Sequence, residues 1–232
     1  MSLFRRRKEP EASGEPDITA LFQQLGVPFQ RKGDAWLVEV GGGWATFGWV
    51  PRDATLVGFL EYAEAPGSST ELLRANAETG LAWYQSDGDD LITRVSLPAA
   101  DLDPAGLTLA IATLGREAGG PEEPAELPDA PPPRLEALLQ ELGDDPGEVV
   151  VAQRGDIVEL RVELQPSASP DEALAAWMLQ MSAIRGARLG IDGSGTLCAI
   201  AAVPGRPGST GGLAWALGEV RELARLYREN AP

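Results

Sequence analysis

One order of strands, turns and helices occurs twice in this chain, and this repetition constrains the fold more than any other feature. In each half, two extended runs joined by a glycine turn precede a capped helix, a second hairpin that ends at a proline, and a long helix. Strand pairs of this kind, alternating with helices, are typical of antiparallel sheets that carry helices on one face. The sequence therefore predicts an α+β protein with an internal duplication.

The first module is predicted over residues 17–118. Apolar residues at helical spacing and runs of β-branched and aromatic residues indicate its elements. In chain order, these are a helix over 18–25, a hairpin over 29–40, strands over 44–50 and 56–60, a helix over 70–78, a hairpin over 81–97 and a helix from 104. The expected N-caps are Asp17, Ser69 or Thr70, and Asp103.

The second module is predicted over residues 134–230. Its expected elements are a helix over 135–142, a hairpin over 148–164, a helix capped near Asp171, a second hairpin over 187–203 and a helix over 210–229. The turn at 153–156 resembles the turn at 31–34, so the strands over 44–60 are expected to have no counterpart. A proline-rich acidic linker over 119–133 joins the modules, and residues 1–16 form a disordered basic tail.

Three segments of the first half carry a family resemblance: TELLRANA (70–77), LITRVSLP (91–98) and LDPAGL (102–107). The same outline recurs over residues 171–227. These segments resemble the YbjN-like family, which is similar in fold to type III secretion chaperones. The resemblance implies two tandem chaperone-like modules, dimerisation and the binding of extended segments of other proteins. It implies no catalytic residues.

The charge of the chain limits its partners. The 19 basic and 35 acidic residues give a net charge of −16, and Arg5–Lys8 concentrates four of the basic residues in the tail. An acidic body repels nucleic-acid phosphates and anionic lipid, and it attracts basic partners. No apolar run approaches the roughly 20 residues that cross a bilayer, and no apolar segment follows the basic tail. We expect a cytoplasmic protein that binds neither nucleic acid directly nor membranes.

The residue types present argue against catalysis. The chain has no histidine, so it lacks the commonest general base and metal ligand. Glycines 41–43 lack the Lys-Ser or Lys-Thr pair of a phosphate loop, and Asp87, Asp89 and Asp90 lack the spacing of a calcium loop. Cys198, the single cysteine, lies in an apolar run that predicts a buried strand. We therefore expect no enzyme activity, no cofactor and no metal.

Aromatic residues give the positive signal for a binding site. They gather over residues 36–62, and alternation places an aromatic residue on each face of the strand over 44–50. One face must meet the core, and the other must meet a helix, the second module or a partner. One interpretation is that these aromatic residues pack in the core and between the two modules. The other is that they line a protein-binding groove, since exposed aromatic residues are common binding anchors. The candidate binding residues are Trp44, Phe47, Trp49, Phe59 and Tyr62.

These observations favour a non-enzymatic, chaperone-like or adaptor protein that binds a segment of another protein. The acidic charge favours a basic or nucleic-acid-handling partner. Exposed strand edges and apolar stripes favour a homodimer. Two alternatives stay open: a structural subunit that associates with itself through its aromatic surface, and a hydrolase that uses paired carboxylates.

Overall fold

The computed structural model describes residues 16–62, 66–78, 80–87, 90–118, 149–154, 156–182, 186–205 and 210–231. Nearly all of the predicted tail, the linker over 119–133 and the predicted helix over 135–142 lie outside these residues. The described residues form two antiparallel sheets with five helices packed against them, which confirms the α+β prediction. None of these helices has the length and apolarity needed to cross a membrane.

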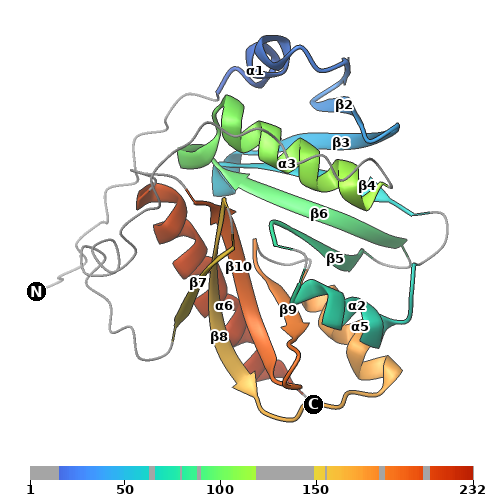
Figure 1. The fold of residues 1–232 in the computed structure, drawn as a ribbon, viewed down its shortest axis with the longest axis vertical. Coiled ribbons are helices and arrows are strands. Elements are labelled where there is room, and N and C mark those ends of the chain that lie inside the picture. The colour runs from blue at the N-terminus through green and yellow to red at the C-terminus, as the bar shows by residue number, and fades with distance from the viewer. Residues whose placement is uncertain are drawn as a thin grey trace, which may run out of the picture.

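The first sheet has six strands in the order β1-β2-β3-β4-β6-β5 (Figure 1). These are β1 (Phe29–Lys32), β2 (Ala35–Val40), β3 (Gly43–Val50), β4 (Thr55–Glu61), β5 (Ala82–Asp87) and β6 (Asp90–Pro98). Helices α1 (Ile18–Leu25) and α3 (Pro104–Glu117) cover one face of this sheet. Alternate strand residues point to that face and form a core with the helices.

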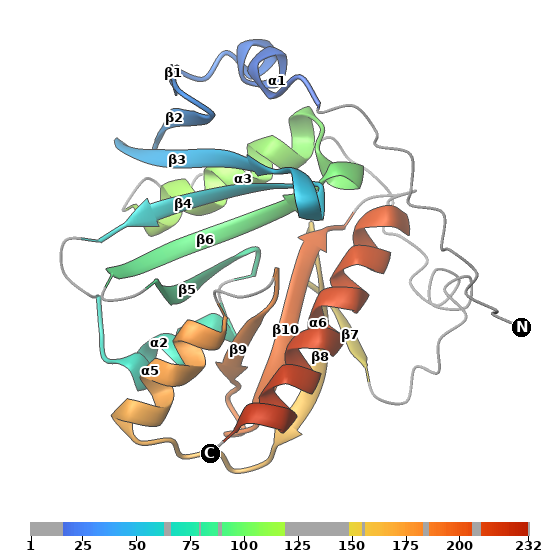
Figure 2. The same ribbon diagram turned by 180° about the vertical axis from the view of Figure 1, so that it is seen from behind.

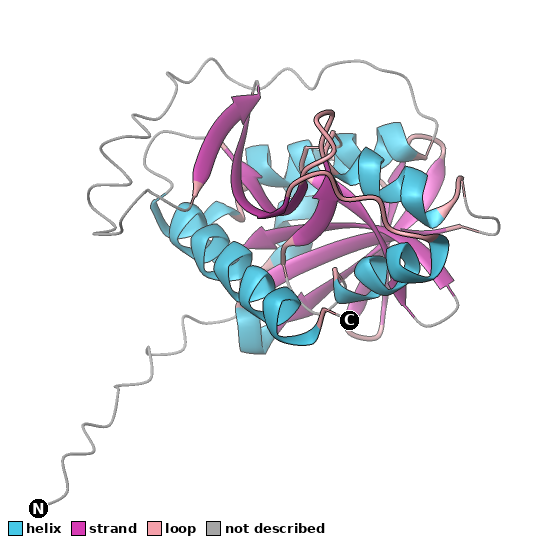
Figure 3. Ribbon diagram, turned by 90° about the horizontal axis from the view of Figure 1, so that it is seen from below, coloured by secondary structure: helices cyan, strands magenta, loops and turns pink. Residues whose placement is uncertain are grey.

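The second sheet has four strands in the order β7-β8-β10-β9. These are β7 (Val150–Arg154), β8 (Ile157–Gln165), β9 (Arg188–Ile191) and β10 (Leu197–Pro204). Helix α6 (Thr210–Asn230) packs along β8 and β10. Helices α2 (Ser69–Asn76) and α5 (Glu172–Met181) pack against each other beside β5 and β9. Figure 3 shows the strands in the middle of the molecule with helices around them.

Local sequence signals set the helix starts. Three predicted N-caps are confirmed, because each side chain accepts a hydrogen bond from the backbone amide three residues later: Asp17, Asp103 and Asp171. Helix α2 begins one residue earlier than predicted, with Ser68 rather than Ser69 or Thr70 as its N-cap. Ser68 accepts from the backbone amide of Glu71, whose carboxylate accepts from the Ser68 amide, so the two residues form a capping box.

The duplication is clear in the strand order. Strands β3, β4, β6 and β5 lie in the same order as β7, β8, β10 and β9, and both sets have a helix after the second strand and a long helix after the last. Two prolines set the same register: Pro98 pairs with Thr55, and Pro204 pairs with Ile157. The matched elements are therefore β3-β4-α2-β5-β6-α3 and β7-β8-α5-β9-β10-α6.

This order corrects the predicted alignment of the two halves. The hairpin over residues 150–165 corresponds to residues 43–61, so the prediction that the strands over 44–60 have no counterpart is wrong. Among the described residues, the surplus elements of the first half are α1, β1 and β2. A glycine turn between two strands looks alike in any hairpin, so the turn sequences could not tell which hairpins are equivalent.

The two halves share their hydrophobic cores. Leu72 and Leu73 of α2 are buried in the core of the second sheet, with residues of α5 and α6. In return, Ile157 of β8 and Ala202 of β10 are buried in the core of the first sheet. Because each core needs side chains from both halves, the two sheets hold a fixed position relative to each other.

Candidate protein-binding face

The face of the six-stranded sheet opposite α3 carries apolar side chains that are partly exposed, and we call it the open face. In Figure 2 it points toward the viewer, with α3 behind the sheet and α6 at one end of β6. Alternation along β2, β3 and β4 places Thr46 and these apolar side chains on it: Leu37, Trp44, Val50, Val57 and Phe59. Trp44 is 49% exposed, which is high for a tryptophan in a strand.

A pocket of about 410 Å³ lies on the open face, and we call it the sheet pocket. Its lining residues are Gly48, Trp49, Val50, Val57, Phe59, Glu61, Gln85, Asp90, Ile92 and Arg94. Strand register explains why they meet: Phe59 lies opposite Arg94, and Ile92 lies between Glu61 and Gln85. Pockets of this size hold small ligands or a few side chains.

The polar side chains of the sheet pocket differ in their surroundings. The Arg94 guanidinium stacks 5.5 Å from the centre of the Trp83 ring, and its Nε donates to Ser96 Oγ over 3.2 Å. Gln85 is only 4% exposed, and its Oε1 has no hydrogen-bond partner within the part of the chain that the structure describes. Glu61 and Asp90 are exposed at the same end of the pocket as Gln85.

Three of the five predicted binding residues border this region. Trp44 and Phe59 lie on the open face, and Phe59 also lines the sheet pocket. Trp49 lines the pocket as well, although it packs against the core on the α3 side. The open face therefore brings together residues that the aromatic pattern had grouped only by their nearness in sequence.

Phe47 and Tyr62 lie on the opposite side of the sheet. Phe47 is fully buried against Phe22, with ring centres 5.5 Å apart, so its side chain is part of the core and not of the open face. Gly58 of the neighbouring strand leaves the space that the Phe47 ring fills. The Tyr62 hydroxyl shares a 2.7 Å hydrogen bond with Thr93 Oγ1, and burial raises the pKa of Tyr62. Strand alternation placed one aromatic face inward but could not say which one.

The other candidate sites from the sequence have structural roles. Cys198 is buried in β10, and burial raises the pKa of its thiol to about 11, so the thiolate is disfavoured. Gly41 and Gly42 have φ angles of +52° and +89° and make the turn between β2 and β3. Asp87 pairs with Asp90 at the end of a hairpin. Across the described residues, no three Asp, Glu or Cys side chains gather as metal ligands would.

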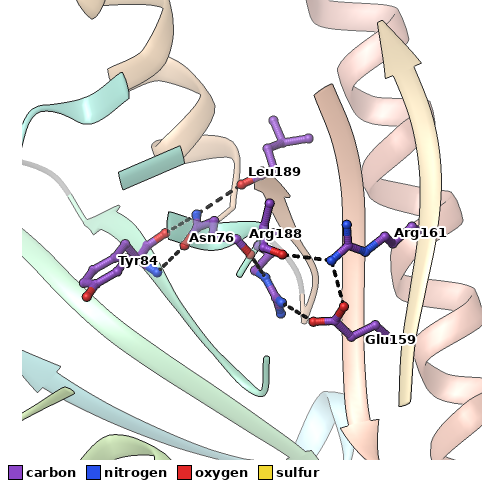
Figure 4. Close-up of polar contacts among 7 residues, drawn as sticks. Asn76, Tyr84, Glu159, Arg161, Arg188 and Leu189 are labelled. Atoms are coloured by element: carbon purple, nitrogen blue, oxygen red, sulfur yellow. Dashed lines mark hydrogen bonds and ion pairs between the residues drawn. The ribbon is translucent and has the colours of Figure 1, made fainter. Parts of the chain in front are cut away.

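A buried junction between the two sheets was not predicted from the sequence. Asn76, at the end of α2, lies between the edge strands β5 and β9 (Figure 4). Its Nδ2 donates to Tyr84 O over 2.9 Å and to Leu189 O over 3.1 Å, and its Oδ1 accepts from Tyr84 N over 2.6 Å. One amide side chain thus satisfies backbone groups on two sheets, as a paired strand would.

Three charged side chains of the second sheet complete this junction. Glu159 is fully buried, and its two oxygens lie 3.1 Å from Arg188 Nη2 and 2.8 Å from Arg161 Nη2. Arg188 Nε also donates to Asn76 O over 2.6 Å, and Arg161 Nη2 donates to Ala77 O over 2.8 Å. These cations therefore bind the carbonyl groups at the end of α2, where the helix dipole is negative.

The junction explains why the middle of this face differs between the two sheets. When the two sheets are aligned on Pro98 and Pro204, Val57, Phe59 and Trp83 of the first sheet occupy the positions of Glu159, Arg161 and Arg188 in the second. In the second half these positions hold charges that anchor the first half. In the first half they hold apolar groups, and the equivalent face is partly exposed.

Helix α5 also supports the start of α2. The Glu172 carboxylate accepts hydrogen bonds from the backbone amides of Ser69 and Thr70. Hydrogen bonds from Ser69, with a smaller effect of Thr70, hold the pKa of Glu172 below its ordinary value. A carboxylate at a helix N-terminus is favourable for the same reason as an N-cap.

Comparison of the chain with protein-family models, with curated proteins and with solved structures finds no match in any of the three. The resemblance to the YbjN-like family therefore stays a prediction from the sequence.

Proposed function

We propose that this chain is a non-enzymatic, chaperone-like or adaptor protein that holds a segment of another protein on the open face. One observation carries the proposal: apolar side chains of β2, β3 and β4 line a partly exposed sheet face that also contains a pocket of about 410 Å³. A contiguous apolar surface of this kind is typical of interaction sites.

The contrast between the two halves supports this function. On the equivalent face of the second sheet, the junction of Glu159, Arg161 and Arg188 with the end of α2 covers β8 and β9, while Val150 of β7 is exposed. An open face that served only to support the fold would be expected to close in a similar way. Trp44 and Phe59 are the proposed anchors, since large aromatic groups contribute most to binding interfaces.

The charge of the chain suggests which partners fit. A net charge of −16 steers basic proteins toward the acidic body and repels phosphate-rich ligands. An extended segment that crosses the strands of the open face matches what the YbjN-like resemblance implies. A basic partner, including one that handles nucleic acid, therefore fits better than nucleic acid itself.

Self-association is the alternative that the same surface allows. A second copy of the chain could cover the open face and give the homodimer expected from the sequence. Sedimentation velocity of the full chain separates the two: a concentration-dependent dimer that disappears with Trp44→Ala supports self-association, and a monomer at micromolar concentration contradicts it. The carboxylate-based hydrolase has weaker support, because Glu61 and Asp90 are both exposed on the rim of the pocket.

Affinity capture with matched variants tests the proposed function. Full-length protein, the double variant Trp44→Ala with Phe59→Ala, and the control Val150→Ala are used to capture partners from native lysate. Val150 is 53% exposed on β7, away from the open face, so its loss should not affect capture. We expect a partner that the wild type and control retain and the double variant loses. Equal capture by all three, or none above background, would contradict the proposal.

A further inference from the structure

We propose that the sheet pocket binds the side chain of a lysine or arginine that belongs to the segment held on the open face. This inference rests on the proposed function and specifies its ligand. It follows from the arrangement of Gln85, Glu61 and Asp90 at one end of the pocket, next to apolar side chains that can hold a flexible stem.

Gln85 provides a hydrogen-bond acceptor. Its side chain is 4% exposed, lines the sheet pocket, and has an Oε1 without a hydrogen-bond partner among the described residues. A buried acceptor in this state is unfavourable, so a turn of the Gln85 side chain that brings Oε1 to the pocket would let a donor there form a hydrogen bond at little desolvation cost to the protein. Ammonium and guanidinium groups carry several donors and no acceptor.

Two carboxylates flank this acceptor. Glu61 lies opposite Ile92, and Ile92 lies opposite Gln85, so the three side chains form one row across β4, β6 and β5. Asp90 lies two residues before Ile92 and therefore on the same face. Charge-assisted hydrogen bonds to carboxylates are the stronger kind, and they favour a cation at this end of the pocket.

Arg94, the cation among the described lining residues, lies one row away from this end of the pocket. Arg94 stacks on Trp83 and donates through Nε to Ser96, in the adjacent row of the sheet. It lies on the opposite side of Ile92 from Asp90 along β6. Phe59 and Ile92 supply the apolar wall against which the methylene stem of a lysine or arginine packs.

The second half shows what removes such a site. The row equivalent to Glu61, Ile92 and Gln85 is Glu163, Cys198 and Gly190. The acidic residue is retained, but a glycine replaces Gln85, and the backbone of Asn76 and Ala77 fills the space beside it. Glu163 therefore has the strand position of Glu61 without its pocket, and it provides a matched control.

Titration with short peptides tests the inference on the full chain labelled with ¹⁵N. The probes are three capped tripeptides with central lysine, norleucine or glutamate between two valines. Amide resonances of Gln85, Phe59 and Ile92, including the Gln85 side chain, report occupancy of the sheet pocket. We expect the lysine peptide to shift them with a Kd of about 1 mM or lower, and the norleucine peptide to bind about tenfold more weakly. The glutamate peptide should not bind.

Charge-neutral variants give the second measurement. Glu61→Gln with Asp90→Asn should weaken the lysine peptide about tenfold and leave the norleucine peptide unchanged. Glu163→Gln with Asp156→Asn removes the same charge elsewhere and should leave both affinities unchanged. Added salt should weaken only the lysine peptide, because the carboxylates are exposed to screening.

Four results would overturn the inference, and they separate it from the proposed function. Equal binding of the lysine and norleucine peptides rejects the cation site but keeps a protein-binding face. No shift of open-face resonances by any peptide counts against both. If Glu163→Gln with Asp156→Asn weakens the lysine peptide as much as Glu61→Gln with Asp90→Asn does, the peptide binds by nonspecific electrostatic attraction. Shifts at the pocket on dilution of the protein, or on removal of residues 1–15, mean that a second copy or the chain's own basic segment occupies it.

Discussion

Replacing Glu159 with glutamine tests how the two halves are held together. Glu159 is fully buried and is the carboxylate shared by Arg188 and Arg161. The substitution keeps the size of the side chain and an acceptor oxygen, but it removes the negative charge. Two guanidinium groups at the junction then lose their common counter-charge.

The expected loss follows from the burial of the two partners. The Arg188 side chain is 1% exposed, so it has no route to water, whereas Arg161 is 13% exposed and can be partly solvated. Removing one member of a buried ion pair costs about 3–5 kcal/mol. Because glutamine retains one acceptor, we expect a loss of about 3 kcal/mol in the free energy of unfolding, at the low end of that range.

Urea denaturation followed by circular dichroism measures this loss. Glu163→Gln is the control, since Glu163 lies four residues along the same strand and is exposed. We expect the control to change the free energy of unfolding by less than about 0.5 kcal/mol. Adding Arg188→Met to a Glu159→Met variant should recover part of the stability that Glu159→Met alone loses, because the more deeply buried of the two uncompensated charges is then absent. A Glu159→Gln loss no larger than that of the control would refute the reasoning.

Three further changes test other parts of the fold. Asn76→Ala removes the three hydrogen bonds that the Asn76 side chain makes to the edge strands β5 and β9, and should lower the free energy of unfolding by about 3 kcal/mol, measured in urea. Gly58→Ala places a Cβ against the Phe47 ring and should cost about 1–3 kcal/mol, whereas Gly48→Ala, with open space around its Cβ, should cost less. The pKa of Glu172 is lowered in the fold, so its stabilising effect is present above the ordinary value of 4.5 and is lost as the pH falls through the folded pKa. Melting temperatures of wild type and Glu172→Gln should therefore differ at neutral pH and converge in acid.

Much of the secondary structure could be predicted because it depends on local chemistry. Asp17 and Asp103 cap the helices that follow them, and Pro98 ends β6 where the alternating run stops. Strand alternation marked the two faces of the sheets. These signals involve residues close in sequence, so no long-range contact is needed to interpret them.

The junction could not be predicted for the opposite reason. Glu159 and Arg161 alternate with apolar residues along β8, which is the pattern of a strand with one face in solvent. Contacts with Asn76 and Ala77, more than 80 residues away in sequence, bury that polar face instead. The residue type does not show whether a polar side chain on a strand is buried or exposed, because that depends on its tertiary contacts.

The sequence alone determined the α+β class, the duplication and the region in which aromatic residues gather, because propensity, alternation and turn chemistry are properties of neighbouring residues. The tertiary structure decided which hairpins are equivalent, that Phe47 belongs to the core, and that Glu159, Arg161 and Arg188 bind the end of α2 where the first half has apolar side chains. Those properties depend on which surfaces the two halves bury against each other, and that packing is set by contacts between residues far apart in the chain.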